Sequence, residues 1–511
     1  MATPALNLRN ISKRFGALLA NDDISLTVQA GDVLGLLGEN GAGKSTLVSI
    51  LFGHYMMDSG SIEVFGQPLA AGDPKAALAA GIGMVHQHFT LADNLSVLDN
   101  VMLGSEPLWQ PFSRRSAART RLLEVAAQFG LTIAPDALVA SLSVGERQRV
   151  EIVKALYRGA KILILDEPTA VLTPQESEVL FDTLQKMVAV GLSVIFISHK
   201  LGEVLRVCHR VAVLRAGKLV ATVNAKTTTQ QQLAVAMVGH EVKEVHVGIA
   251  QLSQRANDLV CELAGVSAGN SARHQVRGIH LQLRAGEITA IAGISGNGQG
   301  ALAELLCGTL ALSAGQISLR GQAWPAKNAA AKLTALGVAR IPEDRRAAGV
   351  VGDLPLWENA VSERLRTPVF SKLGCIKRNA AKGYAQRIVS QFDVRGAGIE
   401  GAAQSLSGGN MQKLILGRAL APPAGQSAPQ LIVAHQPTWG LDIGAVAYVH
   451  EQLLAARANG AAVLLVSDDL DEIMALSDQI AVMHAGELTE TRPPAGWTRE
   501  ALGLAMAGAT A

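Results

Sequence analysis

The stretch Gly38-Glu39-Asn40-Gly41-Ala42-Gly43-Lys44-Ser45-Thr46 decides the fold of this chain. It matches the pattern G-x-x-x-x-G-K-[ST] in full, follows an apolar run at Val33–Leu37 and precedes a second one at Leu47–Phe52. A buried strand, a glycine-rich loop and a helix in this order form a phosphate-binding loop, where backbone N–H groups and the helix N-terminus face the anion. Lys44 is placed to reach the β- and γ-phosphates, and Ser45 to ligate Mg²⁺. The complete pattern and both flanks disfavour the alternative of an ordinary glycine-rich turn.

The length and charge of the chain limit its organisation and partners. At 511 residues it is too long for one hydrophobic core, so at least two domains are expected. A net charge of +2 gives no indication of a nucleic acid as partner. The four cysteines are far apart, which favours reduced thiols in a cytosolic protein over disulfides or zinc. Neither a signal-peptide pattern nor an apolar run of about 18 residues occurs, so we expect any membrane role to depend on a partner.

The sequence repeats itself with a period of about 260 residues. The matching segments are Ala30–Gly35 with Ala285–Ala290, Ser141–Glu146 with Ser405–Asn410, and Val213–Leu219 with Val482–Leu488. Because this period is far too long for a solenoid, it predicts two homologous domains in tandem. We expect the first domain over residues 1–240, a linker over 241–257 and the second domain over 258–511.

Short apolar segments alternate with longer amphipathic segments in each copy. The strands expected in the first copy are Val33–Leu37, Ile162–Leu165, Val194–Ile197 and Val211–Leu214. This alternation predicts an α/β fold in which helices cover a mainly parallel sheet. Charged residues at helical spacing in segments 112–130 and 376–393 predict a helical subdomain within each copy.

Four polar residues after apolar segments are candidates for catalysis. Asp166 and Glu167 end an apolar strand, where Asp166 is placed to hold Mg²⁺ through its water shell and Glu167 to polarise the attacking water. His199 is placed to hydrogen-bond the γ-phosphate, with a capping role as the alternative. Gln87 is placed to contact Mg²⁺ or water, and the two histidines beside it are too few to indicate a metal site.

In this order the segments resemble the ATP-binding cassette (ABC) family of transporter ATPases, over nearly the whole chain. The most specific of them is Leu406-Ser407-Gly408-Gly409-Asn410-Met411-Gln412, which is similar to the family's signature segment. The resemblance implies ATP and Mg²⁺ as ligands of two P-loop domains, each an α/β sheet with a helical subdomain. It also implies that the phosphate loop of one domain faces the signature of the other. Phe15 matches the adenine-stacking aromatic, with a core phenylalanine as the alternative.

The two copies have lost complementary groups. The second copy has Gln299 for the loop lysine, Gly300 and Ala301 for the serine and threonine, Glu343 for Gln87, His435 and Gln436 for the carboxylates, and Asp468 for the histidine. The first copy has Val144 and Glu146 in its signature in place of the usual glycine and glutamine, and lacks the aspartate that the second copy keeps as Asp442. Head-to-tail pairing therefore predicts one complete site and one broken site. In the complete site, the first copy's groups face the signature set Ser407, Gly408, Gly409, Asn410 and Asp442.

This arrangement resembles the energising subunit of bacterial importers for simple sugars and nucleosides. Segments Met84–Phe89, Leu142–Glu146 and Gln436–Ala445 are more similar to the nucleoside branch, although Trp439 stands where arginine is usual. The resemblance implies a peripheral protein on the cytoplasmic face of the inner membrane. It also implies permease subunits as partners and, through them, a periplasmic or lipoprotein solute receptor. The stretch 88–110 is the expected docking surface for the permease.

Three other functions are alternatives to nucleoside import. The first is the same role for a sugar of the ribose, xylose or galactose type. The second is a soluble tandem ATPase that acts on ribosomes, which typically keeps two intact sites and a charged helical linker. The third is a non-catalytic binding module, which is disfavoured because one site retains every catalytic group.

Overall fold

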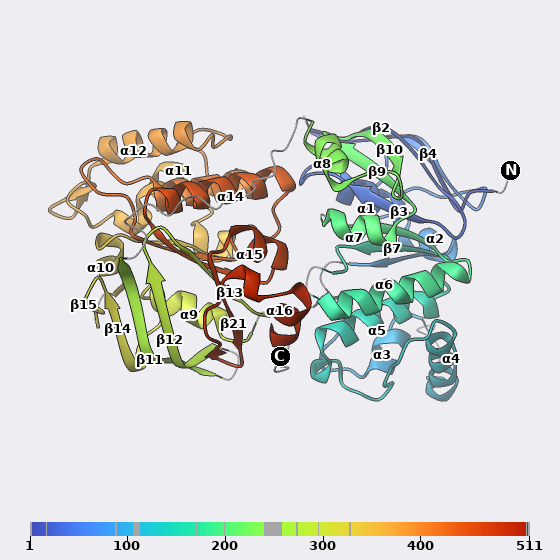
Figure 1. Cartoon of the computed structure of the whole chain (residues 1–511). Helices are drawn as coiled ribbons and strands as arrows, with labels where there is room; N and C mark the ends of the chain where they lie inside the picture. The colour runs from blue at the N-terminus through green and yellow to red at the C-terminus, as the bar shows by residue number, and fades with distance from the viewer. Residues whose placement is uncertain are drawn as a thin grey trace. The chain divides into compact units, whose positions relative to one another are not determined.

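The computed structural model describes the chain except for residues 1–2, 17, 87–88, 106–112, 170–171, 173, 199, 240–257, 272–273, 295, 327–328, 507 and 509–511. It divides into two compact units, Met1–Val242 and Lys243–Ala511 (Figure 1). The linker predicted at 241–257 lies outside the described residues.

The first unit contains an antiparallel sheet and a larger, mainly parallel sheet. The antiparallel sheet has the order β2-β1-β4-β5, formed by β1 (Leu6–Phe15), β2 (Leu18–Val28), β4 (Ser59–Val64) and β5 (Gln67–Pro68). The six-stranded sheet has the order β10-β9-β3-β8-β7-β6, formed by β3 (Val33–Leu37), β6 (Ile82–Val85), β7 (Ile162–Asp166), β8 (Ser193–Ile197), β9 (Arg210–Arg215) and β10 (Lys218–Asn224). Only β10 pairs antiparallel in this larger sheet. All four strands predicted for the first copy are confirmed.

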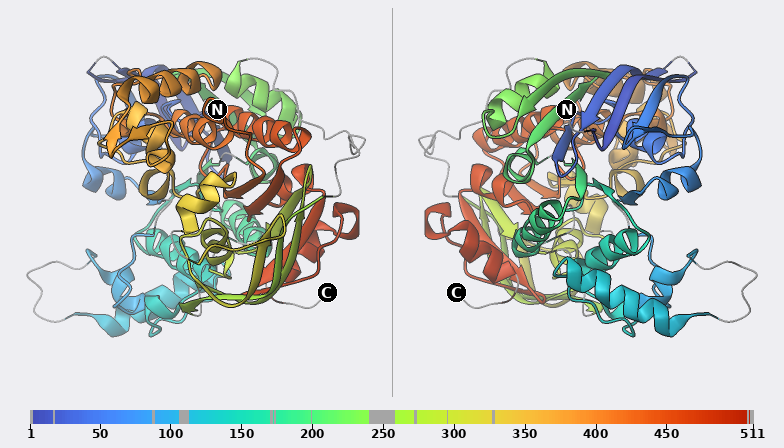
Figure 2. Two further views of the ribbon diagram at one scale, coloured as in Figure 1. Left: turned by 90° about the vertical axis from the view of Figure 1, so that its left-hand side faces the viewer. Right: turned by 90° about the vertical axis from the view of Figure 1, so that its right-hand side faces the viewer.

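Helices cover these sheets and form a separate subdomain. They are α1 (Lys44–Leu51), α2 (Pro74–Ala79), α3 (Val97–Met102), α4 (Arg115–Gln128), α5 (Val144–Tyr157), α6 (Pro174–Ala189), α7 (Leu201–Val207) and α8 (Gln230–Val238), with the 3₁₀ turn η1 (Val139–Ser141). Helix α4 confirms the helix predicted within 112–130. The helices α3 and α4 lie at the end of this unit that is remote from its antiparallel strands (Figure 2).

The second unit repeats this plan. Its four-stranded sheet has the order β12-β11-β14-β15, formed by β11 (Leu259–Ser271), β12 (His274–Arg284), β14 (Leu312–Leu319) and β15 (Gln322–Ala323). Its six-stranded sheet has the order β16-β19-β20-β13-β21-β22, formed by β13 (Ile288–Ala292), β16 (Val338–Ile341), β19 (Leu431–His435), β20 (Ala462–Ser467), β21 (Gln479–His484) and β22 (Glu487–Leu488). A small hairpin joins β17 (Ser371–Lys372) and β18 (Cys375–Ile376).

The helices of the second unit follow the same order. They are α9 (Gln299–Leu306), α10 (Ala329–Ala335), α11 (Leu356–Val361), α12 (Arg378–Gln391), α13 (Gly408–Leu420), α14 (Ile443–Ala458), α15 (Leu470–Leu476) and α16 (Arg499–Met506). Short turns are the π-helical η2 (Arg345–Gly349) and the 3₁₀ turns η3 (Ser362–Arg364), η4 (Ala403–Ser405) and η5 (Pro494–Gly496). Helix α12 confirms the helix predicted within 376–393.

The position of the phosphate loop follows from the burial of the strand before it. Every residue of β3 is buried, and the same is true of its neighbour β8. Strands that are apolar throughout are buried on both faces, as in the centre of a helix-covered parallel sheet. Helix α1 buries its apolar side chains in a core shared with both sheets. The loop between β3 and α1 is therefore held at the carboxyl end of a central strand, the edge where α/β sheets bind ligands.

No helix in the described part of the chain is both long enough and apolar enough to cross a bilayer.

Candidate functional site

The phosphate loop of the first unit has a backbone that requires glycine. Gly38, Gly41 and Gly43 have φ angles of 154°, 85° and 99°, a region that side chains other than glycine rarely adopt. A Cβ added to Gly43 would lie 2.4 Å from the carbonyl oxygen of Ala20. The amide of Asn21 donates a hydrogen bond of 3.0 Å to the Gly43 carbonyl. The end of the loop, where α1 starts, is thus held tightly against β2.

Lys44 is the first residue of α1 and folds back over the loop. Its Nζ donates to the carbonyl oxygens of Gly38 at 2.6 Å and Glu39 at 3.0 Å. Ser45 follows it and is exposed. Of the remaining predicted loop residues, Asn40 is exposed, Ala42 is buried and Thr46 is half-buried. The structure therefore places a cation and an exposed hydroxyl side by side at the start of α1.

The two carboxylates lie at the carboxyl end of β7. Burial, and then the negative charge of Glu167, raise the pKa of Asp166 above its ordinary value, whereas the charge of Lys44 lowers it. Glu167 has a φ of 47°, and its N–H donates to the carbonyl oxygen of Ile197 at 2.9 Å. Left-handed backbone at a residue other than glycine is concentrated at functional sites. Asp166 thus lies within electrostatic range of both Lys44 and Glu167.

The donors at this site fit Mg²⁺, which prefers oxygen ligands and is commonly held by one or two carboxylates together with water and phosphate oxygens. The exposed hydroxyl of Ser45 and the half-buried carboxylate of Asp166 are donors of this kind. Gln87 and His199, which the sequence also places here, lie outside the described residues.

Phe15 ends β1 and is not a core residue, because 41% of its surface is exposed. Its ring packs edge-on against Tyr55, with the ring centroids 5.3 Å apart, and Lys13 Nζ lies 5.5 Å from its centroid. Such a ring offers a stacking surface for a planar base. Tyr55 was missed by the sequence analysis. The sequence signal for Tyr55 was an aromatic residue shortly after α1, in a chain in which only 4% of the residues are aromatic.

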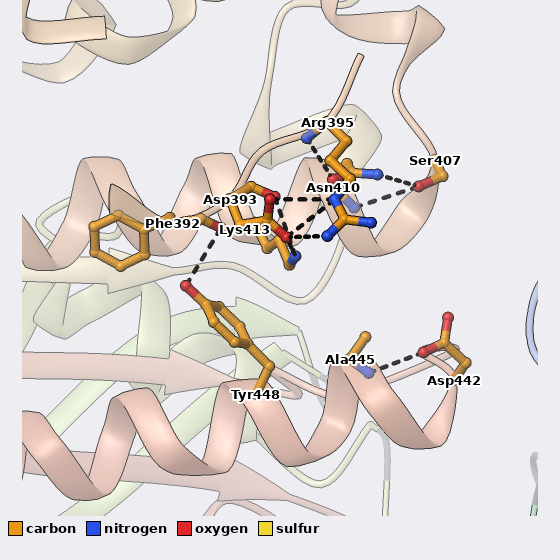
Figure 3. A network of polar contacts seen from close by, with 9 residues as sticks. All are labelled: Phe392, Asp393, Arg395, Ser407, Asn410, Lys413, Asp442, Ala445 and Tyr448. Atoms are coloured by element: carbon orange, nitrogen blue, oxygen red, sulfur yellow. Dashed lines mark hydrogen bonds and ion pairs between the residues drawn. The ribbon is translucent and has the colours of Figure 1, made fainter. Parts of the chain in front are cut away.

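The signature segment of the second unit forms the start of α13 (Figure 3). Ser407 caps the helix, and its hydroxyl accepts hydrogen bonds from the backbone N–H of Asn410 at 3.4 Å and from its side-chain amide at 3.0 Å. The side-chain oxygen Oδ1 of Asn410 in turn accepts from the backbone N–H of Arg395 at 2.8 Å. A Cβ added to Gly408 would meet open space. This helix start therefore carries neither a carboxylate nor a bulky side chain.

Asp442 lies at the start of the helix that packs beside the signature. Its carboxylate caps α14 by accepting from the N–H of Ala445 at 2.8 Å (Figure 3). A Cβ added to Gly409 would lie 3.5 Å from the Cβ of Ala445. The N-termini of α13 and α14, which are the positive ends of both helix dipoles, are thus close neighbours. The structure brings the predicted signature set together.

The equivalent helix of the first unit, α5, begins differently. Ser143 caps it, but here Glu146 Oε2 accepts from the N–H of Ser143 at 2.8 Å, which completes a capping box. Val144 adds an exposed isopropyl group where Gly408 leaves open space. The Glu146 carboxylate offsets the positive end of the helix and repels a second anion.

The phosphate loop of the second unit is closed by its own side chain. Gln299 is only 5% exposed. Its Nε2 donates to the Ile294 carbonyl at 2.8 Å, and its Oε1 accepts from the N–H of Asn297 at 3.1 Å. Gly298 has a φ of 109°, close to that of Gly43, so the loop keeps its shape. The sequence predicted a lost cation, and the structure adds that the replacement occupies a loop N–H.

The carboxylate pair is also replaced without a change of backbone. Gln436 stands in the place of Glu167, with a φ of 46° and an N–H that donates to the Val466 carbonyl at 2.8 Å. Burial lowers the pKa of the preceding His435 to about 4, so this imidazole is uncharged at neutral pH. The second unit has kept the backbone of this site and lost the loop lysine and the carboxylate pair.

Comparison with known proteins identifies the class. The family model described as ABC transporter matches residues 21–170 and again residues 276–425. The chain therefore belongs to the ABC transporter family and is an ATPase of that family, and the predicted family and tandem α/β fold are confirmed.

Three relatives show which members of the family the chain is similar to. It is 40% identical to the nucleoside import ATP-binding protein NupA of Lactococcus lactis subsp. cremoris, over 98% of each chain. It is 41% identical to the guanosine import ATP-binding protein NupO of Bacillus subtilis, over 99% of this chain and 98% of that one. It is also 41% identical to the glucose import ATP-binding protein TsgD13 of Haloferax volcanii, over 99% of this chain and 96% of that one.

Proposed function

We propose that this chain is the ATP-hydrolysing subunit of an importer that carries a nucleoside through a separate permease. The observation that carries the proposal is the division of chemical groups between the two units. The first unit brings Lys44, Asp166 and Glu167 together, and the second has a signature helix that begins without a carboxylate. Neither unit holds the whole set.

In the proposed site, ATP lies on the phosphate loop of the first unit with its adenine against Phe15. Lys44 neutralises the β- and γ-phosphates, and Ser45 and Asp166 hold Mg²⁺, which supplies further charge neutralisation when bound. Glu167 orients the attacking water and accepts its proton. Gln87 and His199 keep their predicted roles beside the metal and the γ-phosphate.

The signature set of the second unit completes this site. Its helix N-terminus donates toward the γ-phosphate, where charge accumulates in the transition state. The opposite pairing, of the second phosphate loop with the first signature, has Gln299 in the loop and Glu146 at the helix start. We therefore propose one hydrolysed ATP per chain and cycle.

The nucleoside assignment rests on resemblance. Two of the relatives above are named for nucleoside and guanosine import, and the segments Met84–Phe89 and Gln436–Ala445 favour the same branch. A sugar is the alternative, because the relative named for glucose import is equally similar.

We propose that the chain binds peripherally to permease subunits at the cytoplasmic face of the membrane and reaches a solute receptor through them. The stretch 88–110 remains the proposed docking surface, partly outside the described residues. Within it Val97 and Leu98 are buried core residues, whereas Phe89, Leu91 and Leu95 are half-buried. Among the described residues, the apolar part of the docking surface therefore rests on the latter three and on Leu103, which is 58% exposed.

Uptake measurements test the proposed cargo. In a strain that lacks this chain, we expect loss of uptake of radiolabelled purine nucleosides, with uptake of ribose, xylose and galactose unchanged. Expression of the wild-type chain should restore nucleoside uptake, and expression of the Lys44→Ala variant should not, because the loop then lacks its cation. Lost sugar uptake with intact nucleoside uptake would transfer the assignment to the sugar alternative.

A further inference from the structure

The second unit contains a cavity of about 650 Å³ beside its closed phosphate loop. The start of α9 forms one wall, and the ends of β16 and β19 form another. We call this space the second-unit cavity. Its lining includes the polar residues Gln299, Glu304, Arg340, Glu343, His435 and Gln436. All lining residues belong to the second unit, so the cavity exists without any contribution from the first.

The lining of this cavity is unsuited to binding phosphate. Gln299 already occupies the N–H of Asn297, and the loop carries neither a lysine nor a serine at the positions of Lys44 and Ser45. Arg340 is the one lysine or arginine side chain among the described lining residues, and its Nε donates to Glu363 Oε1 at 2.7 Å. The phosphate chemistry of the first unit has no equivalent here.

The charge of the lining reinforces this exclusion. Glu304, Glu343 and Asp344 present three carboxylates to the cavity. His274 Nε2 lies 3.1 Å from Glu304 Oε2, and His435, which lies 3.5 Å from Glu343, is uncharged at neutral pH. The lining therefore favours a neutral or cationic ligand that donates N–H groups to carboxylates.

One amide in the cavity is accessible to a ligand. The side chain of Gln436 lines the cavity, and its amide makes no hydrogen bond with any described residue. A glutamine amide offers one donor and one acceptor side by side, which matches the edge of a nucleobase. Glu343, on the neighbouring strand end, adds an acceptor for a base amino group.

We propose that the second-unit cavity is a regulatory site for a phosphate-free nucleobase ligand, a nucleoside, whose base edge is bound by Gln436 and Glu343. The choice of a nucleoside rests on the proposed cargo, which would then report its own accumulation to the ATPase. The exclusion of phosphate rests on the cavity alone.

The cavity wall packs directly on the signature helix. Asp344 and Ala348 line the cavity and belong to the turn η2, which Asp344 caps. A Cβ added to Gly349, at the end of this turn, would lie only 2.6 Å from Ile415 Cδ1 of α13. The turn η2 therefore packs closely against a side chain of α13, which gives a ligand in the cavity a route to act on this helix.

A buried ion network forms a second connection. Arg340 lines the cavity and donates to Glu363 Oε1. The same carboxylate oxygen lies 3.2 Å from Nη2 of Arg418, which is 3% exposed and belongs to α13. Packed cores and ion networks of this kind transmit displacement because they have few alternative arrangements. Occupancy of the cavity is thus coupled to the helix that carries Ser407.

Binding to the full chain tests the site. With the first site saturated by Mg-ATP in the Glu167→Gln variant, titration calorimetry with guanosine should give one bound molecule per chain. Guanosine monophosphate and ribose, at the same millimolar concentration, should not bind. Gln436→Ala should weaken guanosine binding about tenfold, the effect of losing one bidentate base contact.

A matched pair of variants locates the binding. Gly300 lines the cavity within α9, and a Cβ there meets only ordinary contacts, the nearest at 3.7 Å, so Gly300→Leu can extend a side chain beside His274 and His435 and occupy part of the space. Gly383 lies in α12 with open space around it, so Gly383→Leu is the control for an added leucine in a helix. We expect the first variant to abolish guanosine binding and the second to preserve it. Guanosine should also change ATP turnover of the permease complex in the control but not in Gly300→Leu.

Three results would overturn the site: no guanosine binding, binding of the monophosphate as tight as that of guanosine, or binding that survives Gly300→Leu. Unchanged turnover in the control would overturn the coupling to α13. The uptake experiment tests the proposed cargo separately from this site. If the chain bound guanosine in the cavity but energised sugar uptake, only the proposed cargo would be refuted.

Discussion

Glu167→Gln should reduce steady-state ATP turnover about 10²–10³-fold, the typical loss when a positioned base or oriented donor is removed. ATP should still bind, because Lys44 and the phosphate loop are unchanged, so the affinity for Mg-ATP should stay within about twofold. The measurement is phosphate release by the purified permease complex, alongside equilibrium binding of labelled ATP.

The chain itself shows that glutamine fits at this position. Gln436 has the same left-handed backbone as Glu167, with φ of 46° against 47°, and the same N–H bond to the neighbouring strand. Loss of turnover therefore cannot be attributed to misfolding, and the melting temperature should be unchanged. Glu124→Gln on the exposed face of α4 is the control for removal of one carboxylate. Turnover within about threefold of wild type would contradict the role of Glu167 as base.

Asn410→Glu should be nearly as damaging, although Asn410 lies in the other unit. Position 410 is equivalent to position 146 of the first unit, where Glu146 forms a capping box with Ser143. The same box with Ser407 would preserve the helix and place a carboxylate where the γ-phosphate is proposed to bind. We expect a loss of about 10²-fold in turnover, comparable to the removal of an oxyanion donor.

Asn410→Gln separates charge from structure. Both substitutions lose the hydrogen bond from the Arg395 N–H to the Asn410 side chain, but only the glutamate adds charge. Asn410→Gln should therefore retain most turnover, and Glu146→Gln in the first unit should leave turnover unchanged. Equal losses in Asn410→Glu and Asn410→Gln would assign the effect to the lost hydrogen bond and contradict the electrostatic account.

The sequence predicts what depends on short local patterns. The strand before the phosphate loop, the loop itself and the carboxylates of β7 follow from contiguous apolar runs and fixed spacings, and the structure places them as expected. The family resemblance predicted the signature, and the Ser-x-x-Glu pattern at Ser143 also contains the signal for its capping box. Glu146 was recognised only as a nearby negative charge.

Features that depend on tertiary contacts could not be predicted. The Gln299 side chain folds back into its own loop, and this depends on its rotamer and on the space around it. The presence of glutamine in place of lysine in the sequence reveals neither. The contact of Phe15 with Tyr55 joins a strand end to a segment 40 positions later. The π-helical turn η2 and its packing on Ile415 have no sequence signal of this kind.

The central claim is one hydrolytic site built from the first phosphate loop and the second signature. Photocleavage of the permease complex with trapped Mg-ADP and vanadate tests it most directly, because vanadate takes the place of the γ-phosphate and cuts the backbone beside it on irradiation. We predict cuts within Gly38–Thr46 and within Ser407–Asn410 only, located by mass spectrometry of the fragments. Cuts within Ser143–Glu146 or within residues 293–301, or a first-loop cut with none at the signature, would contradict the account.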